Sequence, residues 1–277
     1  MREHSRRGPL ARYTWGMVRS ERLAETGGHG ASALEVPMGT AGYTVRVATA
    51  AGEVAAAQRL RYRVFAEEMG AELPGAVAGR DLDEFDRYCD HVVVRHEATG
   101  RTVGCYRVLP PDGARVAGRL YADEEFDLTS LAGLRPYLVE AGRSCVDPGH
   151  RTGTVIGLAW AGIARYMLTL GHRYLAGCAS VPLADGGGTA AGVWETARHR
   201  HYPPETLRVR PRQPWTGAAP CRSTRPAIPP LLHGYLRLGA YVCGPPSYDR
   251  RFDVADFFVL LDLQRMNRRY LNHFAGL

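Results

Sequence analysis

The sequence contains no lysine, so all 35 of the residues counted as lysine or arginine are arginine. A lysine forms the Schiff base of PLP enzymes, completes the GK[ST] phosphate loop and holds ATP in protein kinases. These three classes of enzyme are therefore excluded.

Long hydrophobic runs are also missing. No stretch approaches the 18 or more apolar residues of a membrane-spanning helix. Residues 1–40 lack the apolar core of a signal peptide and show no lasting periodicity. We therefore expect a cytoplasmic protein that begins with a mobile arm over residues 1–40.

Metal-binding and common hydrolytic motifs are absent as well. The six cysteines form no CxxC pair, and none has a histidine at zinc-ligand spacing, so we expect buried thiols and no metal site. HExxH and the Rossmann fingerprint do not occur, and residues 142–146 lack the second glycine of GxSxG. No histidine is followed five residues later by an acid, which excludes the His-x4-Asp acyltransferases. Metalloprotease, dehydrogenase and serine hydrolase activities have no support.

The composition is that of a globular domain, with 45% hydrophobic and 23% charged residues among 277. Periodicity predicts strands and helices that alternate irregularly along residues 41–277. The expected strands are residues 43–49, 91–96, 102–109, 138–146, 174–181, 241–243 and 256–263. The expected helices are residues 52–69, 154–170, 189–201 and 231–238. This order favours a single α+β domain around a mixed sheet.

Positive charge is concentrated in a Pro/Gly-rich insertion at about residues 185–230. Seven arginines and one acid, Glu205, between residues 196 and 225 give +6 of the net +7. The stretch either contacts an anionic partner or is a solvated loop, and both interpretations stay open. Few aromatic residues are interleaved with these arginines (Tyr202 and Trp215), so nucleic acid is not the expected partner.

Two groupings of acidic and basic residues are candidates for chemistry. Arg61 lies one helical turn before Phe65, and if it faces inward it needs an anion, which the acidic loop of residues 81–90 could supply. The alternative is a surface helix beside a solvated loop. In the second grouping, Glu140 and Arg143 point to opposite faces of a strand unless Gly142 marks a bulge. That strand leads through residues 147–153 to a helix N-terminus, which favours anions.

Several segments in order resemble the ornithine N-acyltransferases, which belong to the GNAT superfamily beside the acyl-homoserine-lactone synthases and make lyso-ornithine lipid. The resemblance runs from about residue 43 to residue 274. The segments that carry it are residues 60–70, 82–91, 104–109, 142–153, 234–240 and 243–246.

The resemblance implies a GNAT-like mixed sheet in which strands 138–146 and 174–181 splay apart around an acyl-pantetheine arm. Backbone N–H groups near the end of the first strand would bind the thioester and the pantetheine amides. The implied donor-binding residues are Ser144, Cys145, Val146, Arg151, Thr152, Gly153 and Thr154.

The donor loop departs from the pattern [RQ]xxGx[GA] of relatives that use acetyl-CoA. Residues 150–155 keep the glycine of this pattern as Gly153. The first position is not Arg or Gln, and the last position is not Gly or Ala. This favours a donor with a single phosphate, namely acyl carrier protein, which is acidic and suits an arginine-rich surface.

The implied reaction is aminolysis of a thioester by ornithine or a similar amino acid. The fatty acyl group is either unsubstituted or 3-hydroxylated, and no cofactor is implied besides the phosphopantetheine-linked donor. By resemblance, Glu84 and Glu140 face the amine as candidate general bases. The implied substrate-binding residues are Arg61, Phe65, Asp86, Arg107 and Arg143. Two alternatives stay open: a peptide or secondary-metabolite amine as acceptor, and a non-catalytic basic module at a membrane surface. Peripheral contact with the inner face of the membrane is expected because the product is a lipid.

Overall fold

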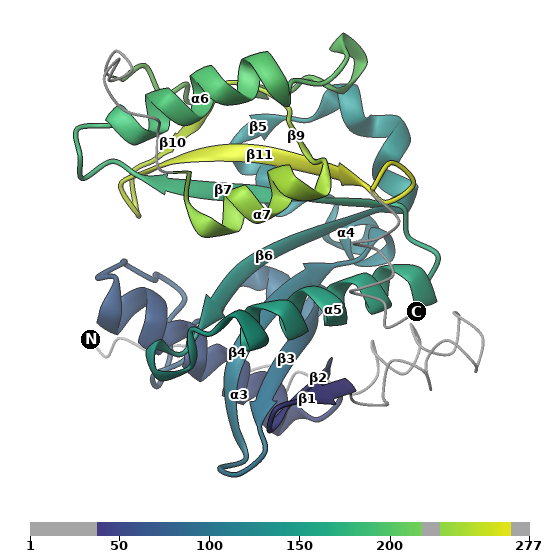
Figure 1. Ribbon diagram of the computed structural model, residues 1–277, viewed down its shortest axis with the longest axis vertical. Coiled ribbons are helices and arrows are strands. Elements are labelled where there is room, and N and C mark those ends of the chain that lie inside the picture. Colours follow the sequence, from purple (N-terminus) through teal and green to yellow (C-terminus); the bar gives the residue numbers. More distant parts are fainter. Residues whose placement is uncertain (1–37, 218–227, 267–277) are drawn as a thin grey trace, which may run out of the picture.

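The computed structural model describes residues 38–217 and 228–266 (Figure 1). Residues 1–37 of the expected arm therefore lie outside the described residues. Residues 38–40 do not belong to an arm, because they pair as a short strand with residues 43–45.

Within the described residues, one mixed sheet of nine strands forms the centre of the molecule. Its strands are β1 (Met38–Thr40), β2 (Tyr43–Val47), β3 (Asp90–His96), β4 (Arg101–Leu109), β6 (Leu138–Val146), β7 (Tyr174–Pro182), β9 (Tyr241–Val242), β10 (Ser247–Asp249) and β11 (Val254–Asp262). The order is β1-β2-β3-β4-β6-β7-β11-β10, with β9 beside β11. Among these pairings only β6 and β7 run parallel. The expected α+β fold with a mixed sheet is confirmed.

Helices cover both faces of this sheet. The α-helices are α3 (Ala51–Tyr62), α4 (Pro111–Ala117), α5 (Gly153–Thr169), α6 (Gly188–Arg200) and α7 (Pro230–Leu238). The shorter helical segments are η1 (Arg63–Glu68), η2 (Glu84–Tyr88), η3 (Tyr121–Glu124), η4 (Thr129–Tyr137), η5 (Pro148–His150) and η6 (Glu205–Leu207). Figure 1 shows α5 and α7 in front of the sheet and α3 behind it. Three clusters of buried apolar side chains fill the spaces between these layers.

Helix α5 lies unusually close to the first strands. A Cβ atom added at Gly162 would lie 2.6 Å from a methyl group of Val45 and 2.8 Å from one of Val92. Glycine at this position therefore lets the helix backbone approach β2 and β3, and this contact fixes the height of the α5 N-terminus above the sheet.

Strands β6 and β7 separate partway along their length, as predicted. They pair only over residues 138–140 of β6 and 174–176 of β7, although each strand continues for six more residues. At the point of separation the chains touch, because a Cβ atom at Gly177 would lie 2.2 Å from the carbonyl oxygen of Ala141. Beyond it β6 turns toward β4 and β7 stays with β11, which leaves a V-shaped opening (Figure 1).

A bulge in β6 accompanies the opening. Between the pairs Cys105–Cys145 and Arg107–Gly142, β6 has one residue more than β4. Within this bulge Arg143 has a φ of 51°, in the left-handed region that disfavours residues with a Cβ atom. The bulge changes which side chains of β6 share a face. Without it, Glu140 and Arg143 would point to opposite faces of the strand.

Three expectations about local structure need correction. The helix expected over residues 52–69 is α-helical only to Tyr62 and continues as a π-helical turn, η1. No helix was expected between residues 109 and 138, yet α4 begins at Pro111.

The segment of residues 185–230 contains the helix expected over residues 189–201, as α6, but also η6 and β8 (Arg210–Pro211), which were not expected. β8 pairs with β5 (Phe126–Asp127) in a second, two-stranded sheet. Val209, in the middle of the basic stretch, is buried, so this part of the chain is packed into the domain.

Candidate active site

A buried ion cluster joins α3 to the acidic loop before β3. Arg61, whose side chain is 0% exposed, donates from Nε to Asp81 at 2.8 Å and from both Nη atoms to Asp86 at 2.8 Å. Burial opposes ionisation of Asp86, but the hydrogen bonds and charge of Arg61 lower its pKa far below the usual range. The inward-facing interpretation of Arg61 is therefore correct. Arg61 and Asp86 were expected to bind substrate, yet both are enclosed by protein, so in this structure they position the loop.

The cluster extends to β4 and β6 through Asp83. Its carboxylate forms ion pairs with Nη1 of Arg107 and with Nη2 of Arg143, the latter at 3.2 Å. Arg143 also lies 5.1 Å from the ring centroid of Tyr121 and donates from Nη1 to its hydroxyl oxygen at 3.3 Å. The bulge in β6 therefore places Arg143 against η3, at the side of the opening.

Glu140 lies at the vertex of the V, on the last residue of β6 that pairs with β7. It is 5% exposed, and its carboxylate accepts hydrogen bonds from the backbone N–H groups of Tyr121 at 2.6 Å and Ala122 at 2.8 Å. Burial raises the pKa of Glu140 to about 7, even though these N–H groups favour the charged form. A carboxylate with this pKa is suited to general-base chemistry near neutral pH.

The structure separates the two predicted bases. Glu84 is exposed, and its carboxylate forms an ion pair with Arg119 at 2.6 Å. Its neighbour Asp83 contacts the arginines of the cluster instead. The sequence could have indicated Asp83, because it caps η2 by accepting a hydrogen bond from the N–H of Phe85, and such caps are frequently aspartate.

Phe65 lies on the π-helical turn η1 and forms an edge-to-face contact with Phe252, with ring centroids 6.3 Å apart. Phe252 belongs to the turn between β10 and β11. The pair therefore links the two halves of the molecule that the V separates. This contact was not predicted, because its two residues are far apart in the sequence.

The predicted donor residues lie along β6 past the vertex and at the start of α5. Beyond Glu140, the edge of β6 that faces β7 pairs with no strand in the described part of the chain, so its backbone groups face the opening. The side chain of Cys145 is buried on the other side, with its Sγ 3.5 Å from Sγ of Cys105, so only its backbone can contact a donor. Ser144 and Val146 are partly exposed.

The loop after β6 leads into the N-terminus of α5. Arg151 donates from Nη2 to Glu68 at 2.7 Å and from Nε to the carbonyl oxygen of Val146 at 3.3 Å, which ties the loop to η1 and β6. Thr152 is the N-cap of α5, and its hydroxyl accepts a hydrogen bond from the N–H of Val155. Gly153 is exposed and Thr154 is half-buried, so the first N–H groups of a 17-residue helix are accessible to an anion.

In the basic stretch of residues 196–225, some of the exposed arginines contact backbone carbonyl groups of neighbouring segments. Arg208 stacks on Tyr202 and donates to the carbonyl oxygen of Pro203, and Arg212 donates to the carbonyl oxygen of Asp123. Arg210 is exposed. Arg222 and Arg225 lie outside the described residues.

Comparison with known proteins identifies the family. Residues 60–161 match the acetyltransferase (GNAT) domain. The chain is 38% identical over 243 residues to the L-ornithine Nα-acyltransferase of Rhodobacter capsulatus, covering 82% of this chain and 93% of the relative. It is 34% identical to the enzyme of the same name from Brucella abortus, covering 84% of this chain and 88% of the relative. The chain belongs to the L-ornithine Nα-acyltransferase family. It is therefore an acyltransferase, and the non-catalytic alternative is excluded.

Solved structures agree with this family at the level of the fold. BjaI, a CoA-dependent acyl-homoserine lactone synthase solved with SAM and isopentyl-CoA, superposes with a TM-score of 0.50 at 16% identity and covers 82% of each chain.

The described part of this acyltransferase has no helix long and apolar enough to cross a membrane.

Proposed function

We propose that this acyltransferase transfers a fatty acyl group from the thioester of an acyl carrier protein to the α-amine of L-ornithine. The observation that carries the proposal is the position of Glu140, a buried carboxylate with a pKa of about 7 at the vertex of the V, in a chain whose relatives are named for this acceptor. The acyl-pantetheine arm enters the opening from the α5 side. The amine approaches from the side of η3.

The proposed reaction is a direct aminolysis. Glu140 takes a proton from the α-ammonium group, directly or through one water molecule, and the neutral amine attacks the thioester carbonyl carbon. Backbone N–H groups on the unpaired edge of β6 stabilise the negative charge on the carbonyl oxygen. The C–S bond then breaks, and the thiolate takes up a proton as the amide forms. No residue needs to form a covalent intermediate.

The donor assignment rests on the surface around the phosphate-binding end. The N-terminus of α5 offers N–H groups for one phosphate, and residues 150 and 155 depart from the pattern of acetyl-CoA-using relatives. An acidic carrier protein complements a chain with net charge +7. Because the product is a lipid, we place the reaction in the cytoplasm, at the inner face of the membrane.

The test is to incubate the purified protein with matched acyl carrier protein and acyl-CoA thioesters, 3-hydroxylated and unsubstituted, and with a panel of amines. Mass spectrometry with fragmentation identifies the product and the nitrogen that carries the acyl group. We expect Nα-acylornithine from the carrier-protein donor, and loss of the product with Glu140→Gln. Acyl transfer to peptides or other amines but not to ornithine would overturn the acceptor assignment.

A further inference from the structure

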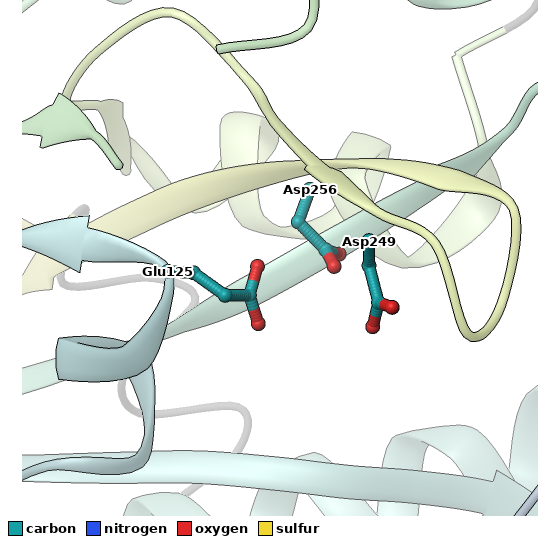
Figure 2. A group of neighbouring side chains, drawn as sticks. All are labelled: Glu125, Asp249 and Asp256. Atoms are coloured by element: carbon teal, nitrogen blue, oxygen red, sulfur yellow. The ribbon is translucent and has the colours of Figure 1, made fainter. Parts of the chain in front are cut away.

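Three carboxylates from distant parts of the chain meet beside the opening. Glu125 follows η3, Asp249 ends β10 and Asp256 lies on β11, and Figure 2 shows their carboxylates turned toward one another. One oxygen from each lies within 4.8 Å of the others. We call these residues the acidic trio.

The acidic trio has no cationic partner within the described residues, although the chain is rich in arginine. Elsewhere in the described structure buried aspartates such as Asp81 and Asp86 are paired with arginine. None of the main electrostatic influences on Glu125 or Asp256 is a positive charge. Burial is the largest cause that raises the pKa of both carboxyl groups, and the negative charge of neighbouring acids raises it further. Within the described residues, three acids therefore come together without a cation that would balance their charge.

One oxygen of the trio is also without a hydrogen-bond donor. Oε2 of Glu125 is shielded from solvent and accepts no hydrogen bond from any described residue. Its neighbour Asp256 is 4% exposed and accepts a hydrogen bond from Ser180 at 2.6 Å, which fixes its orientation. A buried carboxylate oxygen without a donor is unfavourable, and none of the described residues supplies the donor that this oxygen lacks.

The trio lies on the same face of the sheet as Glu140. On β7, Ala176 pairs with Glu140 and Ser180 pairs with Asp256, and these alternate residues share one face. Cys178 lies between them, and after burial the charges of Glu125, Asp256 and Glu140 all contribute to raising the pKa of its thiol. The charge of Glu140 also contributes to raising the pKa of Glu125, so Glu140 and the trio lie near one another on this face.

We infer that the acidic trio binds the side-chain ammonium group of a diamino-acid acceptor while Glu140 faces its α-amine. The inference rests on the proposed function, in which acylation of the α-nitrogen leaves the δ-nitrogen of L-ornithine free and positively charged. An ammonium group has three N–H donors, which matches three converging carboxylates.

The test compares L-ornithine with L-norvaline, which has the same carbon chain without the δ-amine. We expect Asp249→Asn and Glu125→Gln each to raise the KM for L-ornithine about tenfold or more, with little change in kcat, because a charge-assisted hydrogen bond is lost. The KM for L-norvaline should be high in the wild type and unchanged in the variants. The matched control is Asp253→Asn, an exposed acid on the same hairpin, which should leave both values unchanged.

Other results would overturn the inference. Equal efficiency of the wild type with both amino acids, or an equal rise of KM for both in the variants, would show that the trio does not recognise the δ-ammonium group. Loss of activity with EDTA and its recovery with Mg²⁺ or Mn²⁺ would make the trio a metal site. Failure of the wild type to acylate either amino acid would overturn the proposed function itself. Thermal unfolding midpoints confirm that each variant is folded.

Discussion

At the scale of single residues, the proposed chemistry depends on how Glu140 is held. Two backbone N–H groups fix both of its oxygens, while burial keeps its pKa near 7. A fixed carboxylate that changes protonation near neutral pH serves as a proton acceptor without first changing its conformation. The neighbouring aspartates of the ion cluster cannot do this. The pKa of Asp83 and Asp86 is lowered by arginine, so both stay ionised.

Replacing Glu140 tests this assignment. We expect Glu140→Gln to lower kcat by about 10²–10⁴-fold, because a positioned base is lost. In the wild type, kcat/KM should rise with pH through about 7, since the base acts only after it has lost its proton. Initial rates between pH 5.5 and pH 8.5 give both results.

Glu84→Gln is the comparison for Glu140→Gln, because both changes remove one carboxylate charge. Glu84 is exposed and paired with Arg119, so we expect its variant to keep most of the wild-type rate. Equal losses in the two variants would contradict a special role for Glu140.

Arg61 stabilises the fold rather than the reaction. Replacing it with methionine leaves Asp81 and Asp86 buried without their counterion, which should lower the free energy of unfolding by about 3–5 kcal/mol. Urea denaturation measures this change. Arg63→Met is the control, because that side chain is 40% exposed and lies 3.4 Å from its partner Asp147. A decrease of less than about 1 kcal/mol in the free energy of unfolding for Arg61→Met would show that the ion cluster does not hold the acidic loop of residues 81–90 in place.

At the scale of elements, the opening between β6 and β7 depends on one close backbone approach. Gly177→Ala would place a Cβ atom 2.2 Å from the carbonyl oxygen of Ala141, so the strands must move apart at the vertex. We expect a loss of about 1–3 kcal/mol in the free energy of unfolding and a lower kcat, because Glu140 adjoins the displaced residue. Thermal unfolding and initial rates measure the two effects.

Gly157→Ala is the matched control for Gly177→Ala. Gly157 lies within α5, and a Cβ atom there would meet nothing within 4 Å. This variant should stabilise the protein by up to about 1 kcal/mol, because alanine favours a helix more than glycine does. If both variants changed the free energy of unfolding equally, the close approach of residue 177 to Ala141 would not explain the effect of Gly177→Ala.

At the scale of the whole molecule, charge is distributed unevenly. The ion cluster around Arg61 and Asp86 is balanced internally, whereas the basic stretch carries exposed arginines such as Arg200 and Arg210. Charges on a surface act mainly on the rate of association with an oppositely charged partner. We therefore expect an acidic carrier protein to be recognised by its charge.

We expect kcat/KM with the carrier-protein donor to fall several-fold as salt is raised, because charges are screened beyond about 8–10 Å. The variant Arg200→Gln/Arg210→Gln should reproduce this fall at low salt and leave kcat unchanged. Arg208 and Arg212 are left in place, because they hold the backbone of this segment. Equal use of acyl-CoA, with no effect of the double variant, would contradict recognition of a carrier protein.

The sequence by itself determined the elements and the family. Periodicity placed the strands of residues 138–146 and 174–181 and the helix that follows residue 152 within one residue of β6, β7 and α5, because each has a continuous local pattern of apolar side chains. Motifs in order along the chain indicated the acyltransferase family, since such motifs are local as well. The sequence also indicated that Arg61 would need an anion if it faced inward, because a buried guanidinium cannot stay unpaired, but only the structure shows that it is buried.

Only the tertiary structure decided which side chains meet. The bulge at Arg143 places it on the side of Tyr121, and the pairing of β4 with β6, which no local pattern encodes, locates that bulge. At the start of η2 the chain turns Asp83 inward, toward Arg107 of the ion cluster. The next residue, Glu84, points outward and pairs with Arg119. The acidic trio joins residues 125, 249 and 256, which become neighbours only after β10 and β11 fold back along β7. Their separation along the chain is the physical reason that no sequence pattern revealed them.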